Sequence, residues 1–245
     1  MNNKWPIETI RSVEWVGESV IDSADFRQIG ETLDAFWEYP GNPGDHPYHA
    51  LLKSGLHSNG FINCSTMLAE TNICEMLGAQ MINLVGAESL LRRLPFDKVD
   101  VVVGPGNAAI TISYEVARQL RARHGFTEKD AAGSPTLFGS RMQIRPGERV
   151  LIVNELMTTG SGSTYECLQA VRKHQPEADF LPYAVVMVKR SADEMLVDGT
   201  LVIPMFCYDI ANYEPDKCPY CAAGSMAIKP KVSPENWAKL TGKVA

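Results

Sequence analysis

Residues 148–171 read ERVLIVNELMTTGSGSTYECLQAV, and this stretch decides the fold. Its apolar run, RVLIVN (149–154), is typical of a buried strand, and residues 161–174 repeat apolar side chains at helical spacing. Small and hydroxylated residues separate the two patterns, shortly after Glu155. Backbone N–H groups in such a segment can converge on an anion at the positive end of a helix, so the pattern predicts a phosphate site.

The predicted phosphate site consists of five consecutive residues: Thr158, Thr159, Gly160, Ser161 and Gly162. Their hydroxyl groups add donors, and the glycines let the backbone approach a ligand closely. An ordinary turn with a Ser or Thr helix cap is the alternative for an isolated Thr-Thr-Gly, but the length of this run favours phosphate. Neither G-x-x-x-x-G-K-[ST] nor G-x-G-x-x-G occurs, which argues against a nucleoside triphosphatase loop and a dinucleotide fold.

Strand and helix patterns alternate along the rest of the chain. Further strands are expected at VDVVVG (99–104), LPYAVVMV (181–188) and LVIPMF (201–206). A helix is expected through 110–120, and one long helix or two in series over 66–94. This alternation predicts an α/β fold with a parallel sheet flanked by helices, and such sheets bind ligands beyond the carboxyl ends of their strands.

The composition indicates a soluble globular protein of one domain. The 245 residues are 45% hydrophobic and 21% charged, with a formal net charge of -6. This acidic balance argues against a nucleic-acid partner. No window approaches the ~20 apolar residues of a membrane span, and the N-terminus has no apolar signal region. We therefore expect no membrane partner and a cytoplasmic location.

Four segments together carry a resemblance to a known family. The strand, the polar pair Asn154-Glu155, two apolar residues and Thr-Thr-Gly resemble the phosphoribosyl pyrophosphate (PRPP) motif of type I phosphoribosyltransferases. LLKSGLHSNGFIN (51–63), VVVGPGNAAI (101–110) and VVMVKR, which ends in Arg190, narrow the resemblance to orotate phosphoribosyltransferases. All four occur in that family's order over roughly residues 50 to 190.

The resemblance implies the type I phosphoribosyltransferase fold in a single domain. We expect a parallel sheet flanked by helices, an N-terminal helical segment and a small hood over the carboxyl ends of the strands. The expected division is an N-terminal helical segment (1–40), a hood and substrate segment (41–65), a core (66–206) and a C-terminal tail (207–245). A proline- and glycine-rich loop at residues 39–48 marks the first boundary.

The resemblance also implies a role for each matching residue. Glu155 and Asn154 would be catalytic and hold the ribose hydroxyls, and Thr158 to Gly162 would bind the 5'-phosphate of PRPP. Pyrophosphate would be bound by Gly104, Pro105, Gly106 and Asn107, and the base by Lys53, Phe61 and Arg190. Mg²⁺ is implied as cofactor, held largely by substrate oxygens and water. The implied partners are PRPP and a heterocyclic base, with orotate as first candidate, and the implied assembly is a homodimer acting in pyrimidine nucleotide biosynthesis.

The sequence also departs from the family pattern. Orotate enzymes carry a lysine-rich mobile segment before the PRPP strand, whereas residues 134–150 contain neither Lys nor His, and Arg141 and Arg145 are the only cations ahead of the strand. We do not expect so short a segment to do both things, namely to form a hairpin and to reach over a ligand. Asn154 replaces a carboxylate, and Ala108 and Ala109 stand where a lysine is common. A PRPP- or nucleotide-binding sensor without turnover, or a transferase for another base, therefore remains an alternative.

The six cysteines are expected to be thiols, because the chain shows no secretory signal. Cys218-Pro-Tyr-Cys221 has the spacing of half a tetrahedral zinc site, with Cys207 as a candidate third ligand. The alternatives for Cys218 and Cys221 are structural thiols without a chemical role and a disulfide or redox pair. His57 lies in the segment that resembles a substrate site, where it either faces the base or has a solvated or capping role.

Overall fold

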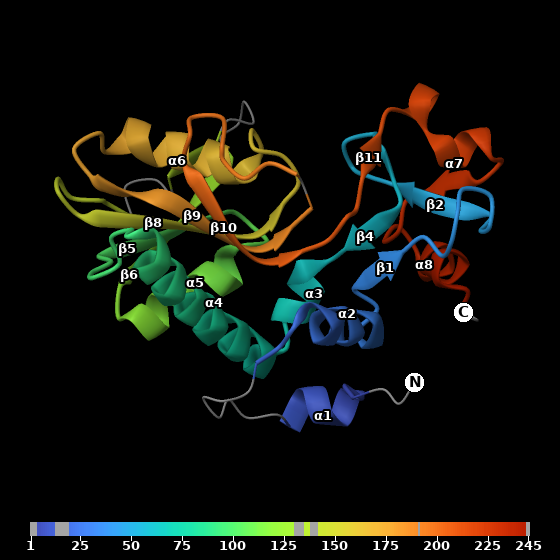
Figure 1. Cartoon of the computed structure of the whole chain (residues 1–245), viewed down its shortest axis with the longest axis horizontal. Helices are drawn as coiled ribbons and strands as arrows, with labels where there is room; N and C mark the ends of the chain where they lie inside the picture. Colours follow the sequence, from blue (N-terminus) through green and yellow to red (C-terminus); the bar gives the residue numbers. More distant parts are fainter. Residues whose placement is uncertain (1–3, 13–19, 130–134, 138–141, 191, 244–245) are drawn as a thin grey trace.

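The computed structural model describes residues 4–12, 20–129, 135–137, 142–190 and 192–243. Two lobes lie beside each other, and the N-terminal helices lie below the junction between them (Figure 1). These helices are α1 (Ile7–Ser12) and α2 (Ser23–Thr32). The described part of the N-terminal segment thus contains two helices, and a short strand follows before residue 40.

The larger lobe is built on a six-stranded sheet with the strand order β10-β9-β8-β5-β6-β7. Five of these strands are parallel, and β7 runs antiparallel to β6 at the edge. This arrangement confirms the predicted α/β fold. The strands are β5 (Val101–Pro105), β6 (Arg123–Lys129), β7 (Pro135–Leu137), β8 (Arg149–Met157), β9 (Asp179–Lys189) and β10 (Leu201–Cys207).

Helices cover both faces of this sheet. On β5, Val102 packs in the cluster that includes α4 and α5, whereas its neighbour Val103 packs in the cluster that includes α6. Alternate residues point to opposite faces of a strand, so strands buried on both sides need continuous apolar runs. The helices are α3 (Cys64–Leu68), α4 (Thr71–Arg92), α5 (Ile110–Leu120) and α6 (Ser163–His174). The 66–94 pattern is thus two helices in series.

The smaller lobe, which we call the hood, has its own sheets and a small apolar core. It contains a four-stranded sheet of order β11-β3-β2-β12 and the antiparallel pair β1-β4. Its buried residues are mainly aromatic and include Trp37, Tyr220 and Trp237. Its elements are β1 (Phe36–Glu38), β2 (Tyr48–Leu51), β3 (His57–Ser58), β4 (Gly60–Ile62), β11 (Asn212–Tyr213), η2 (Pro215–Lys217), α7 (Pro219–Ala222), β12 (Met226–Ile228) and α8 (Pro234–Thr241).

The hood extends beyond the expected residues 41–65. The C-terminal segment contributes β11, α7, β12 and α8, and β12 pairs in parallel with β2. The segment expected to be a tail is therefore part of the hood sheet and of the hood core. No helix in the described ranges combines the length and the apolar character that crossing a bilayer requires.

Candidate functional site

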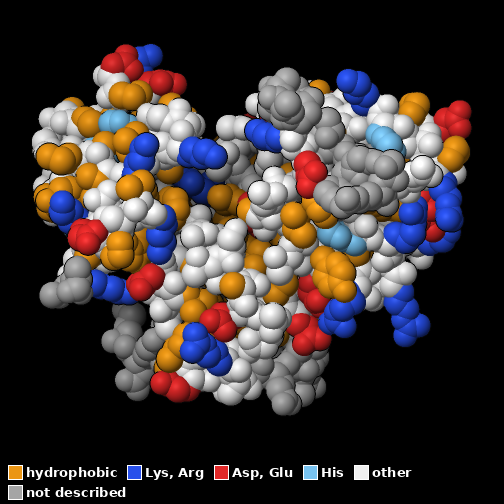
Figure 2. All heavy atoms as spheres, turned by 180° about the vertical axis from the view of Figure 1, so that it is seen from behind, with side chains coloured by type: hydrophobic (Ala, Val, Ile, Leu, Met, Phe, Trp, Pro, Cys, Tyr) orange, Lys and Arg blue, Asp and Glu red, His pale blue; other side chains and the backbone are white. Residues whose placement is uncertain are grey.

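The predicted site segments meet at one edge of the parallel sheet. The loop that begins with Gly106 follows β5, the segment from Thr158 follows β8, and Arg190 follows β9. Because β5, β8 and β9 are neighbouring parallel strands, their carboxyl ends lie side by side. Arg190 also donates its backbone N–H to Met157 O at 2.9 Å, which joins the ends of β9 and β8. From behind, the surface is hollowed between the two lobes, with Lys and Arg side chains on both sides (Figure 2).

The phosphate segment forms a turn that leads directly into α6. Thr159 and Ser161 are exposed, Thr158 and Gly162 are half-buried, and Gly160 is buried. Gly162 is the N-cap of α6 and provides no side-chain cap, so no cap side chain accepts from the N–H groups of the first turn. Free N–H groups at a helix N-terminus favour an anion, and the geometry supports the predicted phosphate site.

Asn154 is buried completely, and its side chain braces the phosphate segment. The Asn154 amide group donates to Thr164 Oγ1 at 2.8 Å and to Ser163 Oγ at 3.1 Å, both on the first turn of α6. It also donates to Leu156 O at 3.0 Å, while Asn154 Oδ1 accepts from the Glu155 N–H at 2.8 Å. These bonds direct Asn154 inward, which favours a positioning role over contact with ribose.

Glu155 is the acidic group of the site, and its environment disfavours charge. Burial raises the pKa of the Glu155 carboxyl from 4.5 to about 7, although N–H groups of Glu155 and Leu156 act in the opposite direction. A carboxyl group with such a pKa changes protonation easily near neutral pH. It can stabilise a developing positive charge once a polar ligand replaces the apolar surroundings.

The segment predicted to bind pyrophosphate is a tight loop between β5 and α5. Gly106 and Asn107 are exposed, whereas Gly104 and Pro105 are buried. Gly106 donates its N–H to Thr127 O at 2.8 Å, and a Cβ at Gly106 would lie 2.5 Å from the same oxygen. A Cβ at Gly104 would lie 2.4 Å from Ser113 Oγ. Close packing against Thr127 O and the Ser113 side chain therefore favours glycine at both positions, which leaves Asn107 as the exposed polar side chain of the loop.

Arg190 connects the core to the hood. Its Nη2 atom donates to Ser58 Oγ at 2.9 Å and to Asn212 Oδ1 at 3.0 Å. Arg190 is only 9% exposed, yet its Nε has no hydrogen-bond partner among the described residues. Burial lowers the pKa of Arg190 to about 10. A buried guanidinium with an unused donor is costly unless a ligand accepts from it, so Arg190 is a candidate contact for an acidic or imide group.

The other two residues predicted to bind the base lie in the hood. Lys53 is exposed in the loop between β2 and β3, where Gly55 adopts a φ of 88°. Phe61 is half-buried, and its ring lies edge-on to Trp237 with centroids 6.1 Å apart. Phe61 therefore packs against the hood core here, and its stacking on a base stays a prediction.

The segment between β6 and β8 contains one further strand. β7 pairs with β6 through residues 135–137 and 127–129, so this part of the chain forms an antiparallel ladder. The expectation that so short a segment does not both form a hairpin and reach over a ligand stays a prediction. Arg145 is exposed, whereas Arg141 lies outside the described residues.

One contact in the phosphate segment has no signal in the sequence. Gly160 donates its N–H to Asp193 Oδ2 at 2.8 Å, so a carboxylate 33 residues away uses a donor suited to phosphate. We expect Asp193→Ala to tighten binding of inorganic phosphate by about 1 kcal/mol, roughly fivefold, because one nearby negative charge is removed. Isothermal titration calorimetry measures this change.

The matched control for Asp193 is its neighbour Glu194, which is also exposed. Glu194→Ala removes the same charge without freeing the Gly160 N–H, so it should change phosphate affinity less. Equal effects of the two variants would mean that charge alone, and not the occupied donor, governs binding.

The chain is similar to known proteins in sequence and in fold. No family model matches the chain. The chain is 33% identical over 182 residues to the orotate phosphoribosyltransferase of Caldicellulosiruptor saccharolyticus, covering 74% of this chain and 87% of that protein. It is 36% identical over 182 residues to that of Pelotomaculum thermopropionicum, with the same coverage.

Two solved structures share the fold at low sequence identity. The orotate phosphoribosyltransferase of Aeropyrum pernix matches with a TM-score of 0.54 and 18% identity, over 74% of this chain and 93% of that one. The Mycobacterium tuberculosis orotate phosphoribosyltransferase in complex with inorganic phosphate matches with a TM-score of 0.51 and 16% identity, over 76% and 96%.

Proposed function

The chain belongs to the orotate phosphoribosyltransferase family, and from this membership we propose that it transfers the phosphoribosyl group of PRPP to orotate. The products are orotidine 5'-monophosphate and pyrophosphate. The observation that carries the proposal is the arrangement at the ends of two neighbouring strands. Glu155 near the end of β8 is followed by the N-terminus of α6, which has no side-chain cap. Arg190 follows β9, and its Nε has no hydrogen-bond partner among the described residues.

The proposed binding mode assigns each segment one part of the substrates. Thr158 to Gly162 bind the 5'-phosphate, Glu155 the ribose hydroxyls, and the exposed end of the 104–107 loop the pyrophosphate. Arg190 and Lys53 bind the acidic base. As the bond from ribose to pyrophosphate breaks, positive charge develops on the sugar, and the ionised Glu155 carboxylate stabilises it. Asn154 holds the segment after β8 in place for this contact.

We propose Mg²⁺ as the cofactor, bound mainly by substrate oxygens and water. Among the described residues, the group of His, Cys, Asp and Glu side chains close enough to hold a metal ion lies in the hood and includes neither Glu155 nor Asn154. A site with one carboxylate suits a cation that keeps several waters and binds phosphate oxygens. Magnesium would supply positive charge to the leaving pyrophosphate. We also propose a homodimer, in keeping with the family resemblance.

A binding protein without turnover is the second candidate. Asp193 uses the Gly160 N–H, and Ala108 and Ala109 bring no cation to the loop after β5. Such a sensor would still bind PRPP but would not convert it.

Pyrophosphate release from PRPP and Mg²⁺, measured with orotate, uracil, hypoxanthine and adenine in parallel, tests the proposal. We expect release with orotate and less than a hundredth of that rate with uracil, which lacks the carboxylate that Arg190 and Lys53 would bind. Pyrophosphate release with hypoxanthine or adenine only would show that a purine, and not orotate, accepts the phosphoribosyl group. No release with any base, together with saturable PRPP binding by calorimetry, would leave the sensor as the function.

A further inference from the structure

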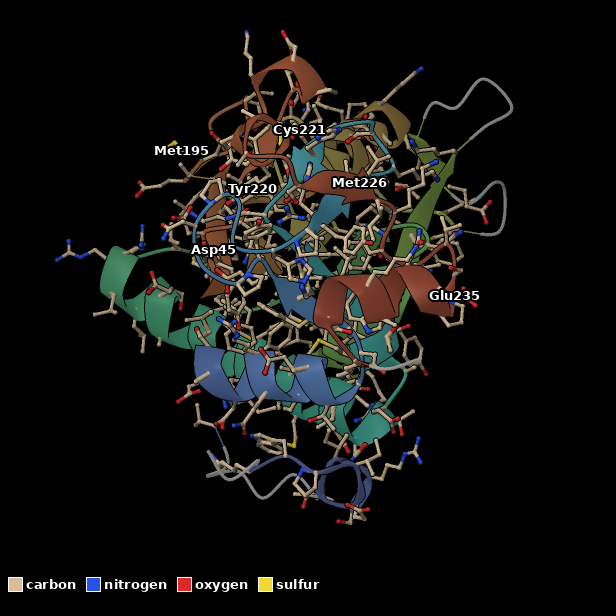
Figure 3. The ribbon with its side chains drawn as sticks, turned by 90° about the vertical axis from the view of Figure 1, so that its right-hand side faces the viewer. Asp45, Met195, Tyr220, Cys221, Met226 and Glu235 are labelled. Carbon is tan, nitrogen blue, oxygen red and sulfur yellow. The ribbon has the colours of Figure 1, made fainter. Side chains whose placement is uncertain are left out.

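Four metal-ligating side chains converge inside the hood, away from the site described above. His49 lies on β2, His57 on β3, Cys218 directly before α7 and Cys221 within α7. One ligand atom from each residue lies within 4.8 Å of the others. Three of the four residues are buried, and Cys221 is exposed. Figure 3 looks onto the hood and shows Tyr220 and Cys221 on the C-terminal segment, over the strands of the hood.

The separations of these atoms are those of a tetrahedral site. Zinc with bonds of about 2.3 Å to sulfur and 2.05 Å to nitrogen places sulfur and nitrogen about 3.6 Å apart, and two nitrogens about 3.3 Å apart. His49 Nε2 lies 3.5 Å from Cys218 Sγ and 3.6 Å from Cys221 Sγ. His57 Nδ1 lies 3.3 Å from Cys221 Sγ and 3.0 Å from His49 Nε2. Only a small expansion is needed to admit the ion.

We propose that His49, His57, Cys218 and Cys221 bind one structural zinc ion. On binding, the two cysteine thiols release their protons to solvent, and the two thiolates neutralise the dipositive ion. A site without net charge suits a buried position beside aromatic residues. Four protein ligands close the coordination sphere, so the site has a structural and not a catalytic composition. Cys207, considered above as a third ligand, lies at the end of β10 and is not part of this group.

A neighbouring hydroxyl group orients one of the ligands. The second ring nitrogen of His49, Nδ1, lies 3.1 Å from Ser225 Oγ, and both residues are buried. A metal-binding histidine commonly donates its other ring N–H to an oxygen, which fixes the tautomer and the ring orientation. With Nδ1–H donated to Ser225, the lone pair of His49 Nε2 points to the centre of the group.

A disulfide between Cys218 and Cys221 is the competing explanation for the cysteine spacing. It accounts for two of the four side chains and leaves the imidazole pair without a reason to meet the sulfur atoms. A hydrogen bond between the imidazoles of His49 and His57 alone likewise leaves the position of the two thiols unexplained. Zinc uses all four groups, and both cysteines are free thiols in this structure.

The ion would join the C-terminal segment to β2 and β3, the strands on either side of the loop that carries Lys53. The hood core is small, with seven buried apolar residues, and small cores often need a metal or disulfide for stability. His57 also precedes Ser58, whose hydroxyl group accepts from Arg190. Loss of zinc should therefore loosen the hood first, and the inference stands whether or not the proposed function is correct.

Metal analysis of the full chain, purified under reducing conditions without chelator, tests the site. We expect about one zinc per chain in the parent protein and in Cys207→Ser, which removes an exposed thiol outside the group. Cys221→Ser and His57→Gln should contain less than a tenth of that amount. A zinc-free parent protein that stays zinc-free after refolding with zinc would overturn the proposal, as would a mass two hydrogens lower that reveals a disulfide.

Cobalt substitution provides a measurement that does not depend on whether ligand variants fold. Co²⁺ bound to the parent chain should show a thiolate charge-transfer band and the intense visible bands of tetrahedral geometry. Ser225→Ala keeps all four ligands and should lower zinc affinity about 10- to 100-fold in competition with a chelator. Cobalt spectra of octahedral type would contradict the proposed ligand set, and unchanged affinity in Ser225→Ala would contradict the orienting role of Ser225.

Discussion

Glu155→Gln is expected to lower kcat/KM by about a hundred- to a thousandfold and, at the same time, to stabilise the ligand-free protein above pH 7. The loss of activity follows because glutamine offers the ribose a hydrogen bond but no negative charge. The gain in stability follows because burial penalises the ionised carboxyl, whose pKa is raised to about 7. One substitution should thus move activity and stability in opposite directions.

The pH dependence of this stability effect has a definite sign. Folded Glu155 has a higher pKa than the unfolded chain, so its protonated form contributes stability that is complete below about pH 4.5 and is lost as the pH rises through about 7. The loss amounts to roughly 3 kcal/mol for a shift of this size. Glu155→Gln removes that loss, so its advantage over the parent should be absent near pH 4 and about 2–3 kcal/mol at pH 8.

Thermal unfolding at pH 4.5 and pH 8, together with pyrophosphate release, measures both effects. At pH 8 we expect the Tm to rise by roughly 4–10 °C for a protein of this size. Glu166→Gln is the matched control because Glu166 lies exposed in the first turn of α6, and it should change neither Tm nor rate substantially. An unchanged Tm at pH 8 would show that Glu155 is not held in an environment that disfavours its charge.

The sheet was predictable wherever strands are buried on both faces. The runs at β5, β8, β9 and β10 are continuously apolar because helices cover both sides, so the strands are evident from composition. β6 was not predicted because RHGFTEK contains four charged or titratable side chains, and only Gly125 and Thr127 of this strand are buried. Its pairing with β5 supplies the backbone contacts that override this weak strand preference.

The candidate site was predictable only as far as its motifs are local. Residues 154–162 run from the end of β8 through the turn to the start of α6, and their sequence order already indicates that they lie together. The contact of Arg190 with Ser58 spans 132 positions, and that of Cys218 with His49 spans 169. Neither pairing has a signal in a single sequence, because the tertiary fold brings the segments together. For this reason the cysteine pair indicated half a zinc site, while its histidine partners were unrecognised.

Arg190→Lys is expected to raise the KM for orotate roughly 100-fold, about 3 kcal/mol, with little change in the KM for PRPP. Lysine keeps the positive charge but lacks the planar guanidinium. In Arg190 that group contacts Ser58 and Asn212 through Nη2, and its Nε, which has no hydrogen-bond partner among the described residues, is left for a ligand. Steady-state kinetics with each substrate varied in turn separate the two KM values. Arg172→Lys is the control, because Arg172 forms an ion pair with Asp198 on the surface of α6.

The difference between the effects on the KM for orotate and on the KM for PRPP distinguishes recognition of the base from a structural role of Arg190. If Arg190 only joined the lobes, its replacement would loosen the hood and weaken the binding of both substrates. Both KM values would then rise, and the Tm would fall. If Arg190 binds the acidic base, the rise in KM should concern orotate alone, because the segments proposed to bind PRPP lie at the ends of β5 and β8 and not in the hood. An orotate KM within twofold of the parent value would remove Arg190 from the base site. The Nε, which has no partner among the residues that the structure describes, would then be a cost of joining the lobes.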